Sequence, residues 1–254
     1  MSGHSKWAQI KRKKAVTDAK RGAVFSKIAK EIIVAARLGG PDPANNFRLR
    51  FAIEKAKANL VPQNNIQRAI EKGAGTGNDD YKIEEIIYEG YGPGGIALLI
   101  QCTTDNKNRT VADLRSYFTK YNGKLGESGS VSWMFTKRGE IKIKRSFFKD
   151  QNKIYELAVE TGAEDMDISD DVYALIITKP EDLEKVQKKI IEKNIIIEET
   201  KISYAPKEHI EITDPEVGKN IVKLLDLIEE HEDVQNVFSN FDIKDELLSG
   251  IKYE

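Results

Sequence analysis

The stretch Glu140-Ile141-Lys142-Ile143-Lys144-Arg145 alternates apolar and charged side chains. A period of two is typical of a β-strand with one face on a core and the other in water. The chain after it predicts a helix around Leu157, strands near 165–169 and 172–178, a helix opened by Pro180, and a strand over 195–204. The order β-α-β-β-α-β over residues 139–204 is that of a ferredoxin-like unit.

The segments on either side of this unit complete one another. Before it, the sequence predicts a strand over 96–103, a helix over 110–121 and a strand over 131–136. After it come a strand over 210–213, a helix over 217–230 and a strand over 234–241. Joined, these elements again read β-α-β-β-α-β, which predicts a second ferredoxin-like domain around the first. We therefore predict an α+β protein in which residues 138–205 are inserted into a discontinuous domain of residues 80–137 and 206–245.

Residues 1–75 come before both domains and differ from them in charge. They hold 16 Lys and Arg against 5 Asp and Glu, whereas the rest of the chain holds 24 against 36. Helical spacing of apolar residues predicts three helices: one from Thr17 or Asp18 to Gly39, one over 46–59 and one over 63–72. We expect a basic three-helix bundle whose charge favours contact with nucleic acid.

The basic bundle supplies the candidate binding residues. The four adjacent cations of residues 11–14 repel one another unless an anion such as phosphate lies among them. Trp7, beside Lys6, can stack on an unpaired base. The alternative is a solvated N-terminal arm with Trp7 against the first helix. Adding the helical cations that fall largely off the apolar stripes, the predicted nucleic-acid-binding residues are Lys6, Trp7, Lys11, Arg12, Lys13, Lys14, Lys20, Arg21, Lys27, Lys30, Arg48 and Arg50.

No catalytic or metal-binding pattern emerges from the sequence. The glycine-rich stretch 90–95 lacks the Lys-Ser/Thr of a P-loop and reads as a hairpin turn, and Cys102 lies in an apolar strand with no His nearby. The aspartates of residues 165–171 lack the glycine and glutamate of a calcium loop. We predict that the protein is not an enzyme and uses no cofactor, metal or small-molecule substrate.

The sequence also predicts where the protein works. It has no run of 18 apolar residues, so we expect no contact with a membrane. The lone Cys102 excludes an intrachain disulfide framework and fits a reducing compartment. We predict a cytoplasmic protein.

Several short blocks of the sequence carry a family likeness. They are Gly3-His4-Ser5-Lys6-Trp7, Gly40-Pro41-Asp42-Pro43, Asn64-Asn65-Ile66-Gln67-Arg68-Ala69-Ile70, Tyr88-Glu89-Gly90-Tyr91-Gly92-Pro93-Gly94-Gly95, Thr104-Asp105-Asn106-Lys107-Asn108-Arg109-Thr110 and Gly126-Glu127-Ser128-Gly129-Ser130-Val131. Together, and in this order, they resemble the YebC/PmpR family. The resemblance implies a helical domain followed by two α/β domains in a cytoplasmic protein with no recognised active site. The family is generally described as DNA-binding transcriptional regulators.

The leading functional prediction is thus a DNA-binding transcriptional regulator that contacts its target through the basic bundle. The family is also similar to the mitochondrial translational activator of cytochrome c oxidase, so the alternative is a ribosome-associated translation factor that binds structured RNA. Charge does not separate the two, because both targets present phosphate. The acidic α/β domains can meet basic ribosomal proteins, or they can keep the body of the protein off the phosphate backbone.

Overall fold

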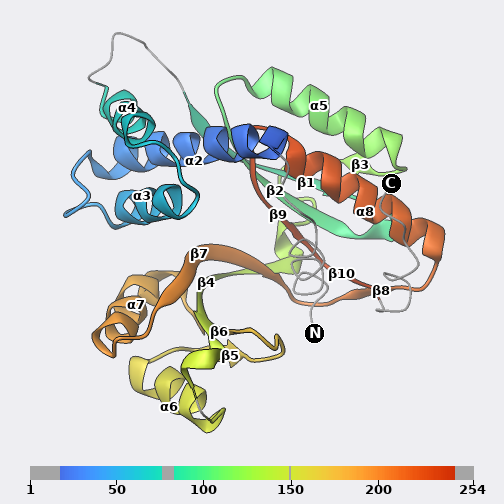
Figure 1. The fold of residues 1–254 in the computed structure, drawn as a ribbon. Coiled ribbons are helices and arrows are strands. Elements are labelled where there is room, and N and C mark those ends of the chain that lie inside the picture. Colours follow the sequence, from blue (N-terminus) through green and yellow to red (C-terminus); the bar gives the residue numbers. More distant parts are fainter. Residues whose placement is uncertain (1–17, 76–82, 149, 244–254) are drawn as a thin grey trace. The chain divides into compact units, whose positions relative to one another are not determined.

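The computed structural model describes residues 18–75, 83–148 and 150–243, apart from the side chains of residues 18–21. The chain divides into two compact units, shown as a ribbon in Figure 1. One unit is formed by residues 135–207, and the other by the chain on both sides of that segment. The predicted α+β class, with helices first and sheets after them, is confirmed.

The described part of residues 18–75 is helical, as predicted. Its helices are α2 (Asp18–Gly39), α3 (Phe47–Ala58) and α4 (Gln63–Gly73). Asn46 fixes the start of α3, because its side-chain oxygen accepts from the N–H of Leu49 at 3.0 Å while its amide nitrogen donates to the carbonyl oxygens of Ala35 and Gly40. Gly40 adopts the left-handed backbone conformation after α2, with φ of 86°.

The helices of this region share one core. Ile28 and Ile32 of α2, Leu49 of α3 and Ile66 of α4 are buried in it. Gly73 lets α2 and α4 approach closely, since a Cβ at that position would lie 2.4 Å from the carbonyl oxygen of Ile33. Among the residues that the structure describes, no helix is both long and apolar enough to cross a membrane.

The same unit contains a four-stranded sheet with two helices packed on it (Figure 1). Its strands, in spatial order, are β3 (Lys124–Leu125), β1 (Glu84–Tyr91), β2 (Ala97–Thr104) and β9 (Val234–Ser239), and its helices are α5 (Lys107–Lys120) and α8 (Pro215–Glu230). Leu98 and Ile100 point from β2 into a core that also holds Phe118 of α5 and Leu225 of α8. Both helices therefore cover one face of the sheet, as in a ferredoxin-like domain.

Two strands that the sequence assigned to this sheet lie elsewhere. Residues 132–134 form a 3-10 turn, and residues 135–136 belong to a strand of the inserted unit. Residues 210–212 form β8 (Ile210–Ile212), which pairs in parallel with β10 (Phe241–Ile243). The place expected for residues 210–213 is taken by β1, which pairs with β2 over all eight residues of each strand. The hairpin turn that the glycine-rich stretch 90–95 predicted brings β1 and β2 together locally, but the predicted β-α-β-β-α-β order left β1 out of the domain.

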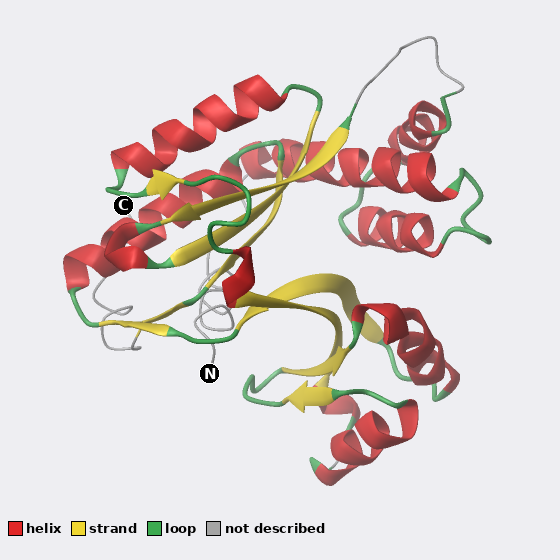
Figure 2. Cartoon of the chain, turned by 180° about the vertical axis from the view of Figure 1, so that it is seen from behind, coloured by secondary structure: helices red, strands yellow, loops and turns green. Residues whose placement is uncertain are grey.

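Residues 135–207 form the predicted ferredoxin-like unit (Figure 2). Its elements are β4 (Phe135–Lys144), α6 (Asn152–Thr161), β5 (Asp165–Asp167), β6 (Tyr173–Thr178), α7 (Leu183–Glu192) and β7 (Ile197–Pro206). The strand order is β5-β6-β4-β7 with antiparallel neighbours. Ile141 and Ile143 point inward from β4 to a core shared with α6 and α7. The alternation that predicted this strand is confirmed.

Candidate nucleic-acid interface

Most of the predicted arm residues fall outside the described part of the chain. This holds for Lys6, Trp7, Lys11, Arg12, Lys13 and Lys14. Lys20 and Arg21 lie within α2, but their side chains are not among those described. Binding of nucleic acid by these residues stays a prediction.

Lys30 has a different task from the one predicted. Its side chain lies in a buried ion pair with Asp233, whose side chain is fully enclosed. Asp233 also accepts from Nη2 of Arg109 at 2.9 Å, from the hydroxyl of Thr110 at 2.7 Å and from the hydroxyl of Thr104 at 3.1 Å. Residues of the block 104–110 thus bind one carboxylate that joins α2 to the sheet. Lys30 is engaged in this buried pair and does not belong to the interface.

The surroundings of Asp233 stabilise its charged form. Burial alone would raise the pKa of this carboxyl, but hydrogen bonds from Lys30, Arg109 and Thr110 outweigh burial and lower it. Thr110 therefore belongs to the buried network, and α5 begins three residues before it, at Lys107. The cap of α5 is Asn106, whose side chain accepts from the N–H of Arg109 at 3.1 Å.

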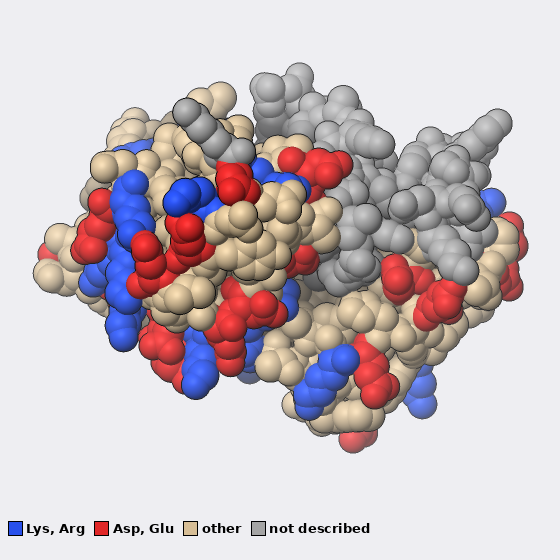
Figure 3. All heavy atoms as spheres, turned by 90° about the horizontal axis from the view of Figure 1, so that it is seen from below, with Lys and Arg blue, Asp and Glu red and all other residues tan. Residues whose placement is uncertain are grey.

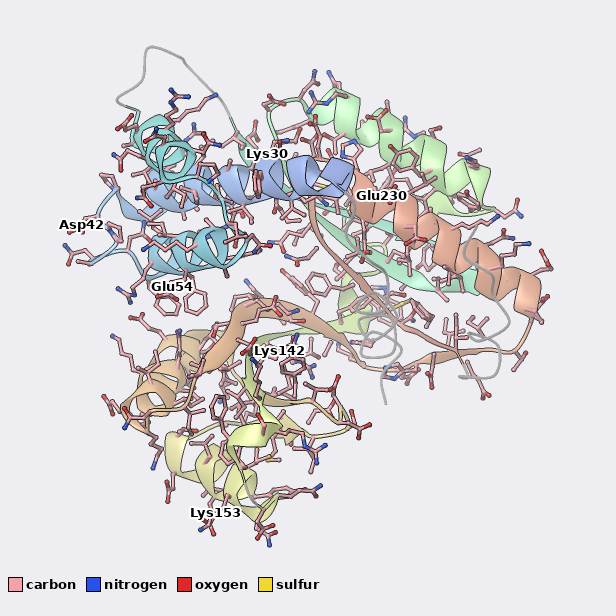
Figure 4. All side chains as sticks on the ribbon, in the orientation of Figure 1. Lys30, Asp42, Glu54, Lys142, Lys153 and Glu230 are labelled. Carbon is pink, nitrogen blue, oxygen red and sulfur yellow. The ribbon has the colours of Figure 1, made fainter. Side chains whose placement is uncertain are left out.

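The side chain of Lys27 also binds another part of the protein. Its ammonium group donates to the carbonyl oxygen of Glu229 in the last turn of α8, where helix carbonyls lack partners within the helix. Figure 4 labels Lys30 on α2 and Glu230 at this end of α8. Burial lowers the pKa of Lys27 to about 8, with neighbouring charges making smaller contributions. Lys27 holds α2 to α8, so it does not belong to the interface either.

Arg48 and Arg50 are the predicted binding residues whose side chains the structure describes near the surface. Arg48 is exposed and forms a two-pronged ion pair with Glu85 of β1. Arg50 is half-buried and donates to the carbonyl oxygen of Pro43 at 3.0 Å, with Phe47 beneath its guanidinium group at 5.6 Å. Exposed ion pairs contribute little stability, so Arg48 can exchange its carboxylate for a phosphate.

The positive charge of this region is concentrated at its beginning. Residues 1–21 hold 7 Lys and Arg against 1 Asp, whereas residues 22–75 hold 9 against 4. Of those 9, Lys27 and Lys30 bind other parts of the protein. The described surface of the bundle is therefore only moderately basic.

The open face of the inserted sheet is no basic platform either. Lys142 lies 3.8 Å from Glu199 and places its ammonium group 4.5 Å from the centre of the Tyr173 ring, while Arg138 pairs with Glu140 at 2.7 Å. On the face seen in Figure 3, acidic and basic side chains are interspersed over the described residues. The aspartates of residues 165–171 cap turns, as Asp167 does for the N–H of Ser169 at 2.8 Å.

Two further blocks of the sequence have structural tasks. The carboxylate of Glu89 accepts from the backbone N–H groups of Gly129, Val131 and Ser132 at 2.7–2.8 Å, which fixes the loop after Gly126. Burial would raise the pKa of Glu89, but these three donors lower it. The glycine-rich stretch is a hairpin turn, as predicted, closed by Gly92 N–H to the carbonyl oxygen of Ile96 at 2.8 Å.

Cys102 lies on β2 and is fully buried. Burial raises the pKa of its thiol to about 12, so the reactive thiolate is scarce at neutral pH. Its environment is that of a core residue, as the apolar strand predicted.

Sequence reasoning treated α4 only as part of a bundle, yet its outer face is distinctive. Asn64, Asn65 and Arg68 are exposed, and their side chains form no hydrogen bond or ion pair within the part of the chain that the structure describes. The adjoining Gln63 and Gln67 line a cavity of about 490 Å³ between α3, α4 and the loop after Gly40. The helical spacing of Ile66, Ala69 and Ile70 is the sequence signal that could have indicated this exposed face.

Comparison with known proteins agrees with this architecture. Residues 5–76 match the family model described as TACO1/YebC protein N-terminal domain, and residues 83–241 match that described as TACO1/YebC second and third domain. A probable transcriptional regulatory protein of Desulfotalea psychrophila is 50% identical over 252 residues, which are 99% of each chain. Another, from Gloeothece citriformis, is 49% identical over 253 residues and 98% of each chain.

A solved structure shares the fold. The crystal structure of a conserved hypothetical protein from Aquifex aeolicus is 46% identical in sequence and gives a TM-score of 0.87. The match covers 96% of this chain and 99% of that one. With both family models matched in sequence order and relatives aligned over almost their whole length, this protein belongs to the TACO1/YebC family.

Proposed function

We propose that the protein is a non-enzymatic regulator of transcription that binds duplex DNA through its basic N-terminal region. The observation that carries the proposal is the concentration of 7 Lys and Arg against 1 Asp in residues 1–21. The names of its relatives, probable transcriptional regulatory proteins, support a regulatory role. Cations clustered at one end of a chain whose remainder is acidic direct that end toward phosphate.

The direct test is the salt dependence of DNA binding. If Lys11, Arg12, Lys13 and Lys14 each neutralise one phosphate, replacing all four with Gln lowers the slope of log affinity against log salt by roughly 3 to 4 units on duplex DNA. Fluorescence anisotropy with a labelled duplex over a range of salt concentrations measures this slope. The loss is expected to be nearly uniform across sequences, because phosphate contacts carry no base information.

A matched variant controls for the change in net charge. Lys179, Lys185, Lys188 and Lys193 are exposed on the inserted unit, and replacing all four with Gln removes the same charge elsewhere. The slope of this control is expected to stay at the wild-type value. An arm variant with an unchanged slope would show that residues 11–14 are only a solvated charge run.

Trp7 favours one alternative target, structured RNA on the ribosome. An aromatic side chain in a basic arm stacks on unpaired bases, which loops and bulges offer and plain duplex DNA does not. Trp7→Ala is expected to weaken binding to a looped RNA by roughly 1–3 kcal/mol if RNA is the target, with little change on a duplex. Anisotropy titrations with both probes measure the difference, and equal affinities of wild type and variant for the looped RNA would contradict this alternative.

A further inference from the structure

The exposed face of α4 is built from residues that the fold does not use. Ile66, Ala69 and Gly73 are buried on one side of the helix. Asn64, Asn65 and Arg68 lie on the other side, where spacings of three and four residues place them on one surface. No side-chain partner for these three exists among the described residues.

These residues are also poor choices for the stability of α4. Asparagine is among the weaker helix formers, yet two of them stand in the first turn. That turn has no acidic residue, and Pro62 before it offers no side-chain cap, although both devices would stabilise a helix start. Residues that weaken a helix and touch nothing in it are expected where a surface serves a partner.

The chemistry of this face matches the edges of bases. An asparagine side chain can donate from its amide nitrogen to N7 of adenine and accept at its amide oxygen from the N6 amino group, and a guanidinium group donates to O6 and N7 of guanine. These patterns are displayed in the major groove of duplex DNA, which is wide enough for one α-helix. Residues near the beginning of a helix are those that contact bases in helices of this kind.

The other helices of the bundle are less available. Lys27 and Lys30 tie α2 to the sheet and α8, and α2 packs on both of its neighbours in the bundle. On α3, Arg50 holds the loop after Gly40, and the exposed Arg48 pairs with Glu85 in a contact that a phosphate can replace. On α4 itself, Gln67 donates to Glu71 at 2.9 Å, which leaves Gln63, Asn64, Asn65 and Arg68 as exposed polar side chains without a partner among the described residues.

We infer that α4 reads base sequence in the major groove of duplex DNA, with Asn64 and Asn65 facing adenine and Arg68 facing guanine. This inference rests on the proposed function, because it assigns sequence preference to a protein whose arm supplies the affinity. It assigns two kinds of contact to two parts of residues 1–75. The arm contacts phosphates, and α4 contacts bases.

The test begins with selection of preferred duplexes from a random pool by the full-length wild-type protein. Binding to the selected duplex and to a scrambled one is then compared for two variants, the double variant Asn64→Ala with Asn65→Ala, and Arg68→Lys. Each lost two-point contact is expected to reduce the ratio of the two affinities about 5- to 150-fold, the equivalent of 1–3 kcal/mol. Affinity for the scrambled duplex and the salt slope are expected to change little.

Neither variant is expected to disturb the fold, so a change in sequence preference can be assigned to the lost contacts. Alanine favours the helix more than asparagine does, and Arg68→Lys retains the charge while losing the planar fork. Lys57→Gln on α3, which removes an exposed cation with no described partner, is the control and is expected to keep the preference.

The failures of the two ideas are distinguishable. A wild-type protein that binds no duplex DNA would overturn the proposed function. A wild-type protein that binds duplexes without preference, or α4 variants that keep the preference, would overturn the inference alone. A preference found only for looped RNA, and abolished by the same variants, would overturn the assignment to the major groove.

Discussion

At the scale of single residues, Asp233 explains more of the structure than any charge on the surface. It collects hydrogen bonds from α2, from β2 and from both Arg109 and Thr110 of α5. Because the carboxylate is enclosed and paired, removing its charge leaves the ammonium group of Lys30 buried without a counter-ion.

We predict that Asp233→Asn lowers the free energy of unfolding by about 3–5 kcal/mol at neutral pH, the usual effect of breaking a buried ion pair. The folded state lowers the pKa of Asp233, so its carboxylate adds stability above the ordinary value near pH 4, and this stability is lost as the pH falls below it. The difference between wild type and variant should therefore shrink in acid. Urea unfolding at pH 7 and at pH 3 measures it.

Asp171→Asn is a suitable comparison, since Asp171 is exposed on the inserted unit. Its effect is expected to stay within about 0.5 kcal/mol at either pH. A similarly small effect at Asp233 would mean that the buried pair contributes no more than a surface charge.

The sequence could not identify the lysines whose side chains bind other parts of the protein. Lys30 and Arg48 both fall off an apolar stripe, yet Lys30 meets an aspartate 203 residues later in the chain. Periodicity describes one helix at a time, so it carries no information about such a distant partner.

At the scale of elements, local sequence signals predicted the helices well, but they did not predict which strands pair in the larger sheet. The helices of the bundle were predicted because each of them carries its own apolar stripe. The strand over 210–212 was also found, but it pairs with β10 instead of joining the larger sheet. Its short run of apolar residues marks a strand without specifying the neighbour.

The contact between α2 and α4 gives a prediction of its own. Gly73→Ala is expected to lower the free energy of unfolding by about 1–3 kcal/mol, because the new Cβ would meet the backbone of Ile33 and force the helices apart. Gly22→Ala on α2 is the matched control, with open space around it, and is expected to raise stability by roughly 0.5–1 kcal/mol. Thermal or urea unfolding compares the two, and a gain at both positions would contradict the close approach.

At the scale of the whole molecule, residues 135–207 have the properties of an independent domain. They have a core of their own, and their ends are neighbours, since Phe135 of β4 pairs with Pro206 of β7. We predict that this segment, produced alone, unfolds cooperatively in urea with a free energy of roughly 3–5 kcal/mol, as expected for a single small core. A gradual, non-cooperative loss of circular dichroism would show that it depends on the flanking chain.

The separation of Lys30 from Asp233 also sets an order of events during synthesis. At about 5–20 residues per second, the aspartate leaves the ribosome on the order of 10–40 s after the lysine. β9, the partner of β2, emerges equally late. In that interval the bundle and the inserted unit can fold, while β2 waits with one edge unpaired and Lys30 remains in water. Asp233 and β9 therefore complete contacts with parts of the chain that were made much earlier.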